Sequence, residues 1–208
     1  MDTLLLSYLP TDLCPLSFVL PYKVLQFYTQ VYLESFISLI RTPCSVRVKV
    51  NFEKLRSLVL GLLKLFIRLS FPTVSQITTE KFADWLANPA KPQPFVLDAR
   101  SQAEYAVSHI NTSVRIDPVA SDLTILSKVS KDTPIIVYCS VGYRSAKVAQ
   151  QLHREGFTQI FNLSGGLFQW ANEERPIFKD DGQLTQLVHP YDAIWGKLLK
   201  NSYHAEDY

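Results

Sequence analysis

Cys139 is the residue of this chain whose surroundings best suit nucleophilic chemistry. It follows the apolar run 135–138, which is typical of a buried strand, and a short loop containing Gly142 leads to a helical pattern that opens at Arg144. Such a loop can point successive backbone N–H groups inward, and the helix N-terminus and Arg144 add positive charge. All three features favour the nucleophilic thiolate, and they equally favour a bound anion such as a persulfide, thiosulfate or phosphate.

A buried, inert cysteine at the end of a strand is the alternative, and position alone does not separate the two. The glycine, the arginine and the helix start after Cys139 favour reactivity. The other two cysteines, Cys14 and Cys44, stand in apolar surroundings and are expected to be bystanders. Three cysteines cannot form a fully paired framework, and no Cys-x-x-Cys or Cys/His cluster offers a metal site. Free thiols favour a reducing compartment, and we expect a cytoplasmic protein without metal or organic cofactor.

Short apolar segments that alternate with helical patterns must position this cysteine. The expected strands and helices are those of an α/β fold with a parallel sheet that helices cover on both faces. In such sheets ligands bind beyond the carboxyl ends of the strands, where Cys139 stands. The expected strands are 95–97, 114–116, 135–138 and 160–163, and the expected helices are 78–88 (with Thr78 as N-cap), 101–106, 122–128, 144–155 and 165–173, followed by a short tail helix within 190–200.

Four ordered motifs between residues 74 and 178 resemble those of the rhodanese family. The loop from Cys139 to Ser145 resembles the family's Cys-x-x-Gly-x-Arg-Ser active-site loop. The other three are Asp98-Ala99-Arg100 with Glu104-Tyr105, then His109-Ile110, then Gly165-Gly166-Leu167 with Trp170. Ser108 and the stretch 111–113 depart from the family pattern. These departures lie in a connecting loop, so they affect the expected path of that loop and not the chemistry.

The resemblance implies a sulfurtransferase that uses Cys139 as its nucleophile. The thiolate would take the sulfane sulfur of a small anionic donor such as thiosulfate and pass it, as a persulfide, to a thiol, a cyanide ion or an acceptor protein. Arg144 would help to bind the anionic donor, while Ser140, Val141, Gly142, Tyr143 and Ser145 would contribute mainly backbone groups and shape access. Asp98, Arg100, Glu104 and His109 would support the site from outside, and the spacing of Arg100 and Glu104 predicts an ion pair between them.

Two other functions are compatible with parts of this pattern. A cysteine phosphatase needs Cys-x5-Arg to encircle a phosphoryl group, whereas Cys139 and Arg144 are spaced as Cys-x4-Arg, which suits a single sulfur atom better. A non-catalytic or regulatory interaction module of the same family, tethered by its N-terminal helices, is the alternative from another class. The presence of Cys139 argues against this module without deciding the question.

We expect three segments: an apolar, basic and helical N-terminal extension over 1–73, a rhodanese-like domain over 74–178, and a C-terminal tail with a short helix over 179–208; the charge distribution sets the first apart. Residues 1–73 hold eight basic and four acidic side chains, a net of +4, and the remainder holds 13 and 15, a net of −2, which together give the +2 of the chain. A global charge this small does not suggest nucleic-acid binding. The hydrophobic share of 47% allows a packed core, and the acidic start Met1-Asp2 lacks the basic region of a secretory signal.

Within the first segment, residues 24–40 and 54–71 are each expected to form a helix. Their uncharged runs reach only about ten residues, too short to span a membrane. On a helical wheel of 54–71 a basic stripe adjoins a wide apolar surface, whereas Arg56 falls outside the stripe. Peripheral contact with an anionic membrane, packing against the other helix or a partner, and a segment that is not a native folded unit all remain open. The basic stripe comprises Lys54, Ser57, Gly61, Lys64 and Arg68.

Overall fold

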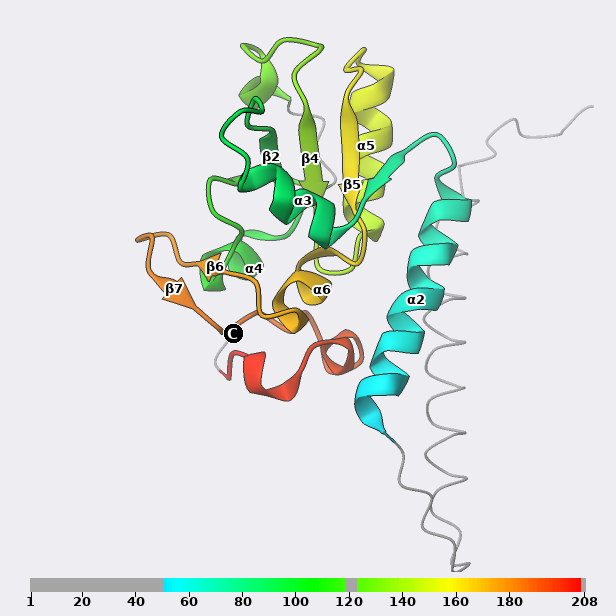
Figure 1. The fold of residues 1–208 in the computed structure, drawn as a ribbon, viewed down its shortest axis with the longest axis vertical. Coiled ribbons are helices and arrows are strands. Elements are labelled where there is room, and N and C mark those ends of the chain that lie inside the picture. Colours follow the sequence, from blue (N-terminus) through cyan, green and yellow to red (C-terminus); the bar gives the residue numbers. More distant parts are fainter. Residues whose placement is uncertain (1–50, 119–122, 207–208) are drawn as a thin grey trace, which may run out of the picture. The chain divides into compact units, whose positions relative to one another are not determined.

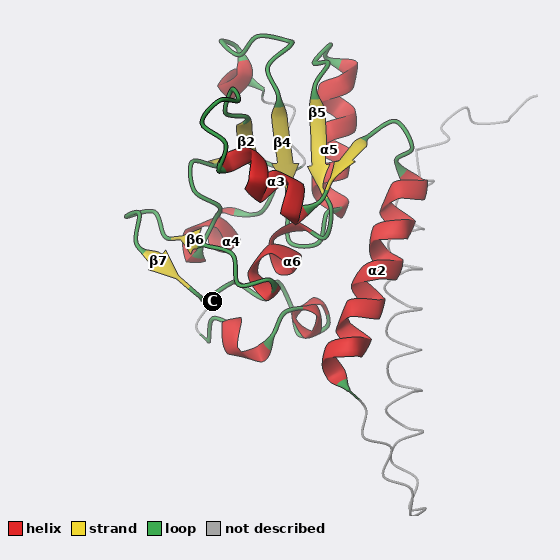
Figure 2. Cartoon of the chain, in the orientation of Figure 1, coloured by secondary structure: helices red, strands yellow, loops and turns green. Residues whose placement is uncertain are grey.

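A five-stranded parallel sheet forms the centre of the computed structural model, which describes residues 51–118 and 123–206 (Figures 1 and 2). The strand order is β1-β5-β4-β2-β3, so that the strand leading into Cys139 lies in the middle. The α/β fold with a parallel sheet is therefore confirmed. The strands are β1 (Ser75–Ile77), β2 (Phe95–Asp98), β3 (Val114–Arg115), β4 (Ile135–Tyr138) and β5 (Ile160–Leu163).

Helices flank this sheet (Figure 1). Helix α5 packs on β4 and β5, while α3 contacts α6. All four side chains of β4 are buried, as expected for a central strand that is covered on both faces. The helices are α2 (Phe52–Ser70), α3 (Thr79–Leu86), α4 (Gln102–Val107), α5 (Tyr143–Arg154) and α6 (Gly166–Asn172).

Local capping explains where these helices begin. The Thr78 hydroxyl accepts a hydrogen bond from the N–H of Lys81, which confirms it as the N-cap of α3. Ser101 and Glu104 form a reciprocal capping box at the start of α4. The capping box of α4 also fixes the Glu104 side chain, whose carboxylate reaches the loop at the end of β4.

Two predicted helices are shorter than expected. In the described part of the segment 122–128, residues 123–128, the helical structure is limited to the 3-10 turn Thr124–Leu126, because the hydrogen bonds there connect residues three apart. The tail segment 190–200 contains only the 3-10 turn Trp195–Leu198. Before that turn, Asp192 accepts hydrogen bonds from the N–H groups of residues 194 and 195, which satisfies donors that a longer helix would use internally.

The C-terminal part of the chain folds back onto the same body. Strands β6 (Ile177–Phe178) and β7 (Leu184–Thr185) form an antiparallel hairpin. The side chain of Asn172 then binds the carbonyl of Leu198 and the N–H of Lys200, which fixes the tail against α6. A last 3-10 turn covers Asn201–Tyr203.

Helix α2 belongs to the same compact unit as the sheet. It confirms the helix predicted over 54–71, and it buries Leu60, Leu63 and Ile67 on one face. Its N-terminal half contacts the turn Trp195–Leu198. Among the helices of residues 51–118 and 123–206, none is both long and apolar enough to cross a bilayer. The predicted helix 24–40, Cys14 and Cys44 lie outside the described residues.

Candidate active site

The chain turns sharply between β4 and α5, and Cys139 opens this turn. Gly142 has a φ of +105°, a conformation that residues with a Cβ rarely adopt. This conformation brings the Gly142 N–H to 3.1 Å from the Cys139 Sγ. The Cys139 side chain is 1% exposed, so the sulfur lies inside the turn at the carboxyl end of the sheet.

Helix α6 fixes the orientation of the loop backbone. Its first N–H groups, from Leu167 and Phe168, donate to the carbonyls of Cys139 and Ser140 at 2.8 and 2.9 Å. Gly166 permits this approach, because a Cβ at that position would collide with both carbonyls. Since these carbonyls are turned toward α6 and bonded there, they do not oppose a negative charge at the sulfur.

A buried carboxylate, Glu104, holds the other side of the loop. It accepts two hydrogen bonds of 2.7 Å from the Arg144 guanidinium and one from the Ser140 hydroxyl, also at 2.7 Å. Burial raises the pKa of Glu104, but the hydrogen bonds and charge of Arg144, helped by Ser101 and Ser140, lower it to about 2. Glu104 is therefore ionised at neutral pH and ties residues 140 and 144 together.

Arg144 is held on more than one side. Besides its bonds to Glu104, it donates to the Ser140 hydroxyl at 2.9 Å, and the Tyr191 ring lies 4.9 Å from its guanidinium carbon. Burial lowers the pKa of Arg144, but the hydrogen bond with Glu104 and the electrostatic interaction with Cys139 raise it above its ordinary value.

The ion pair predicted between Arg100 and Glu104 is wrong. Arg100 instead binds the Asp98 carboxylate, with its Nη2 2.6 Å from Oδ2, and both side chains are fully buried. Arg100 precedes the N-cap Ser101, so it is not a helical residue and the i,i+4 geometry does not apply to it. Its Nη2 also donates to the Ser108 carbonyl, which anchors the connecting loop beyond α4.

The remaining predicted site residues lie around this centre. The Ser145 hydroxyl donates to Asn162 on β5, and the Asn162 amide donates to the carbonyl of Gly142. His109 stacks on Tyr105 of α4 at 4.1 Å between ring centroids. Val141 is 8% exposed.

Tyr143 contacts α2 rather than the sheet. Its ring meets Phe71 edge-on at 5.5 Å and stacks with Phe66 at 6.5 Å between centroids. The end of the Ile67 side chain lies 3.6 Å from the position of a Cβ at Gly142. The end of α2 thus packs directly against the Cys139 loop.

Sequence reasoning missed three residues of this environment. Asn162 gave a signal, since it is a polar residue in an otherwise apolar strand. Ile67 and Tyr191 gave none, because they come from segments flanking the sheet, and only the folded chain brings them to the loop. Near Tyr191, burial lowers the pKa of His189; the negative charge of Glu104 opposes this shift, while the positive charges of Arg100 and Arg144 add to it.

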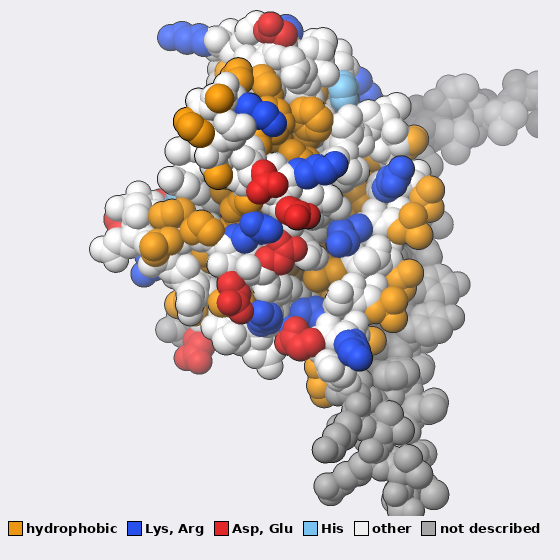
Figure 3. All heavy atoms as spheres, in the orientation of Figure 1, with side chains coloured by type: hydrophobic (Ala, Val, Ile, Leu, Met, Phe, Trp, Pro, Cys, Tyr) orange, Lys and Arg blue, Asp and Glu red, His pale blue; other side chains and the backbone are white. Residues whose placement is uncertain are grey.

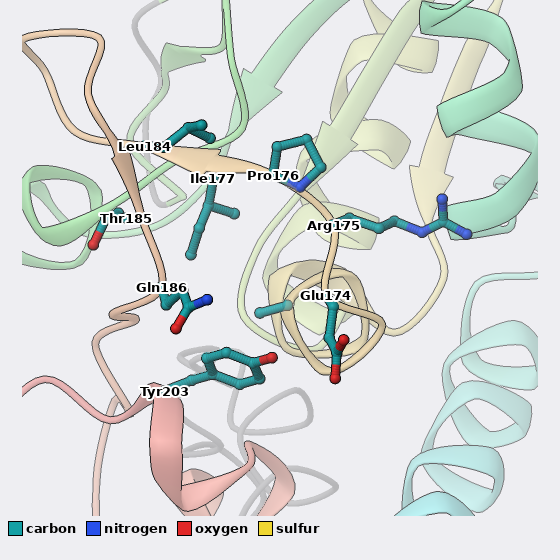
Figure 4. A pocket seen from close by; sticks show the side chains of 9 residues that line it. Glu174, Arg175, Pro176, Ile177, Leu184, Thr185, Gln186 and Tyr203 are labelled. Atoms are coloured by element: carbon teal, nitrogen blue, oxygen red, sulfur yellow. The ribbon is translucent and has the colours of Figure 1, made fainter.

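A separate hollow of about 470 Å³ lies between the end of α6 and the β6–β7 hairpin (Figure 4). Gln186 and Tyr203 line it, while the Arg175 side chain points away from them. It contains no residue of the Cys139 loop. Within the described part of the chain, no three His, Cys, Asp or Glu side chains gather as a metal-ion site.

These features define an α/β protein with a cysteine cradled by a strand–loop–helix turn. Residues 79–173 match the family model of the rhodanese-like domain. The chain is 33% identical over 75 residues to "Thiosulfate sulfurtransferase GlpE" of Coxiella burnetii, covering 36% of this chain and 69% of that protein. It is 28% identical over 109 residues to a "Sulfurtransferase" of Allochromatium vinosum, covering 52% of this chain and 99% of that protein.

The chain belongs to the rhodanese-like family. Among solved structures, a thiosulfate sulfurtransferase from Pseudomonas aeruginosa matches with a TM-score of 0.49 and 20% identity, over 65% of this chain and 26% of that one.

Proposed function

We propose that this protein transfers sulfane sulfur from thiosulfate or a persulfide donor to a thiophilic acceptor through a persulfide on Cys139. The observation that carries the proposal is the hydrogen bond of 3.1 Å from the Gly142 N–H to the Cys139 Sγ within a Cys-x4-Arg loop. A donor N–H aimed at the sulfur stabilises a thiolate, and it can equally hold a persulfide anion. The names of the curated relatives support the same reaction class.

The proposed sulfur transfer needs no external oxidant or reductant. The Cys139 thiolate attacks the sulfane sulfur of thiosulfate, a new S–S bond forms, and the S–S bond of thiosulfate breaks as sulfite leaves with the electron pair. An acceptor such as cyanide then attacks the outer sulfur and leaves as thiocyanate, which regenerates the thiolate. Both steps require one thiol and no metal or organic cofactor.

The network around Glu104 suits a positioning role. Ser140 and Arg144 each bind Glu104, so the loop is held closed at both of its ends. Three hydrogen bonds of the guanidinium are already used, to Glu104 and Ser140. We therefore propose that Arg144 acts on the anionic donor mainly through its charge, while the backbone of residues 140–143 and Ser145 shapes the space at the sulfur.

A sulfurtransferase assay with thiosulfate and cyanide tests the proposal. We expect release of sulfite and thiocyanate by the full chain, and no release by Cys139→Ala. Mass spectrometry after thiosulfate treatment should find one added sulfur on the peptide that carries Cys139. Equal activity in the variant would instead favour the interaction module, and sulfur added at Cys14 or Cys44 would show that the nucleophile is misassigned.

A further inference from the structure

Helix α2 carries apolar side chains on two opposite faces. The inner face, formed by Leu60, Leu63 and Ile67, is buried against the rest of the protein. The outer face is equally apolar, but no described part of the chain buries it. We call this face the outer leucine row; it consists of Leu58, Leu62, Leu65 and Leu69, which are 60%, 59%, 53% and 71% exposed.

Basic side chains border this row on one side. At about 100° per residue, Lys54, Lys64 and Arg68 occupy the sector of the wheel next to the outer leucine row. Figure 3 shows apolar and basic side chains side by side along the helix at the right of the view. Arg56 does not belong to this border, since it pairs with Glu53 at 2.7 Å and its side chain is only 12% exposed.

The charge of α2 indicates which kind of surface could cover the outer leucine row. Glu53 is the only acidic residue of α2, and it is already paired with Arg56. A second copy packed through the same face would therefore bring basic borders together with no acidic side chain between them. An anionic lipid surface offers both things that the face lacks, namely an apolar interior for the leucines and negative charge for the basic border.

We propose that the outer leucine row and its basic border dock this protein on an anionic lipid surface, with α2 lying in the plane of the interface. The same helix contacts the Cys139 loop through Ile67 and Phe66, and so does Phe71, the residue that caps its C-terminus. Docking would thus hold the candidate active site close to the lipid surface. The inference goes beyond the proposed sulfur transfer and does not depend on it.

Vesicle flotation of the full chain tests the leucines first. We expect binding to vesicles of phosphatidylcholine with added phosphatidylglycerol, and binding at least about tenfold weaker for the double variant Leu62→Gln/Leu65→Gln. Glutamine keeps the helix propensity, and both positions are exposed, so folding should be retained. Leu184→Gln, at a site on β7 that is 69% exposed, is the matched control and should bind as the unmodified protein does.

The basic border is tested separately. We expect Lys54→Gln and Arg68→Gln each to weaken binding to the anionic vesicles about fivefold, with little effect on vesicles of phosphatidylcholine alone. Unchanged flotation of the double leucine variant would overturn the proposal, as would a dimer in sedimentation that the same variant disrupts while the vesicles bind neither protein. Cys139→Ala should float as the unmodified protein does, so docking and sulfur transfer can fail independently.

Discussion

The Cys139 loop and helix α2 lie against each other, but different interactions hold them in place. The loop is fixed by buried polar groups, with Glu104 bonded to both Ser140 and Arg144. Helix α2 is attached mainly through one apolar face, with one hydrogen bond from Arg56 to the Lys197 carbonyl, and its ion pair within the helix involves the largely exposed Glu53. A loop fixed in this way keeps one geometry, whereas a helix attached on one side leaves its other side available for a second surface.

The largest expected difference between the two regions concerns their ion pairs. Arg144→Met would leave the Glu104 carboxylate buried without its cation, and we expect a loss of about 3–5 kcal/mol in the free energy of unfolding. Glu53→Gln removes the 65% exposed member of the α2 ion pair and leaves the hydrogen bond from Arg56 to the Lys197 carbonyl in place, so it should cost about 1 kcal/mol or less. Urea denaturation of both variants measures the difference. Similar losses would mean that the buried pair does not fix the loop.

Acid should weaken the loop through the same carboxylate. The folded pKa of Glu104 is about 2 and its ordinary value is 4.5, so its stabilising contribution is complete above about pH 5 and is lost as the pH falls toward 2. The difference corresponds to about 3 kcal/mol. Glu104→Gln mimics the protonated form, and we expect it to be less stable than the unmodified protein at pH 7 but nearly equal to it at the acid end. A stability gap that stays constant over this range of pH would contradict the assignment.

The two regions also differ in how much of their structure could be predicted from the sequence. Strand β4 and the helix start after Gly142 follow from local patterns, and the structure has them at the predicted residues to within one position. The ion pair of Glu104 with Arg144 does not follow from local patterns. The two residues are 40 positions apart, and only the packing of β2 beside β4 brings them together. For the same reason the wheel of α2 showed a wide apolar surface but could not show which half the folded protein buries.

The smallest expected difference concerns the two faces of α2 itself. Ile67, 2% exposed and packed beside Gly142, should cost about 2–3 kcal/mol when changed to alanine, because the substitution leaves a cavity at the loop. Leu65, two residues away and 53% exposed, should cost about 0.5 kcal/mol or less in the same substitution. Ile67→Ala should also lower the rate of sulfur transfer, since the cavity frees Gly142, whereas Leu65→Ala should leave the rate unchanged. Denaturation and the cyanide assay on both variants measure these effects, and a rate that Ile67→Ala leaves unchanged would show that α2 supports the fold without helping to position the loop.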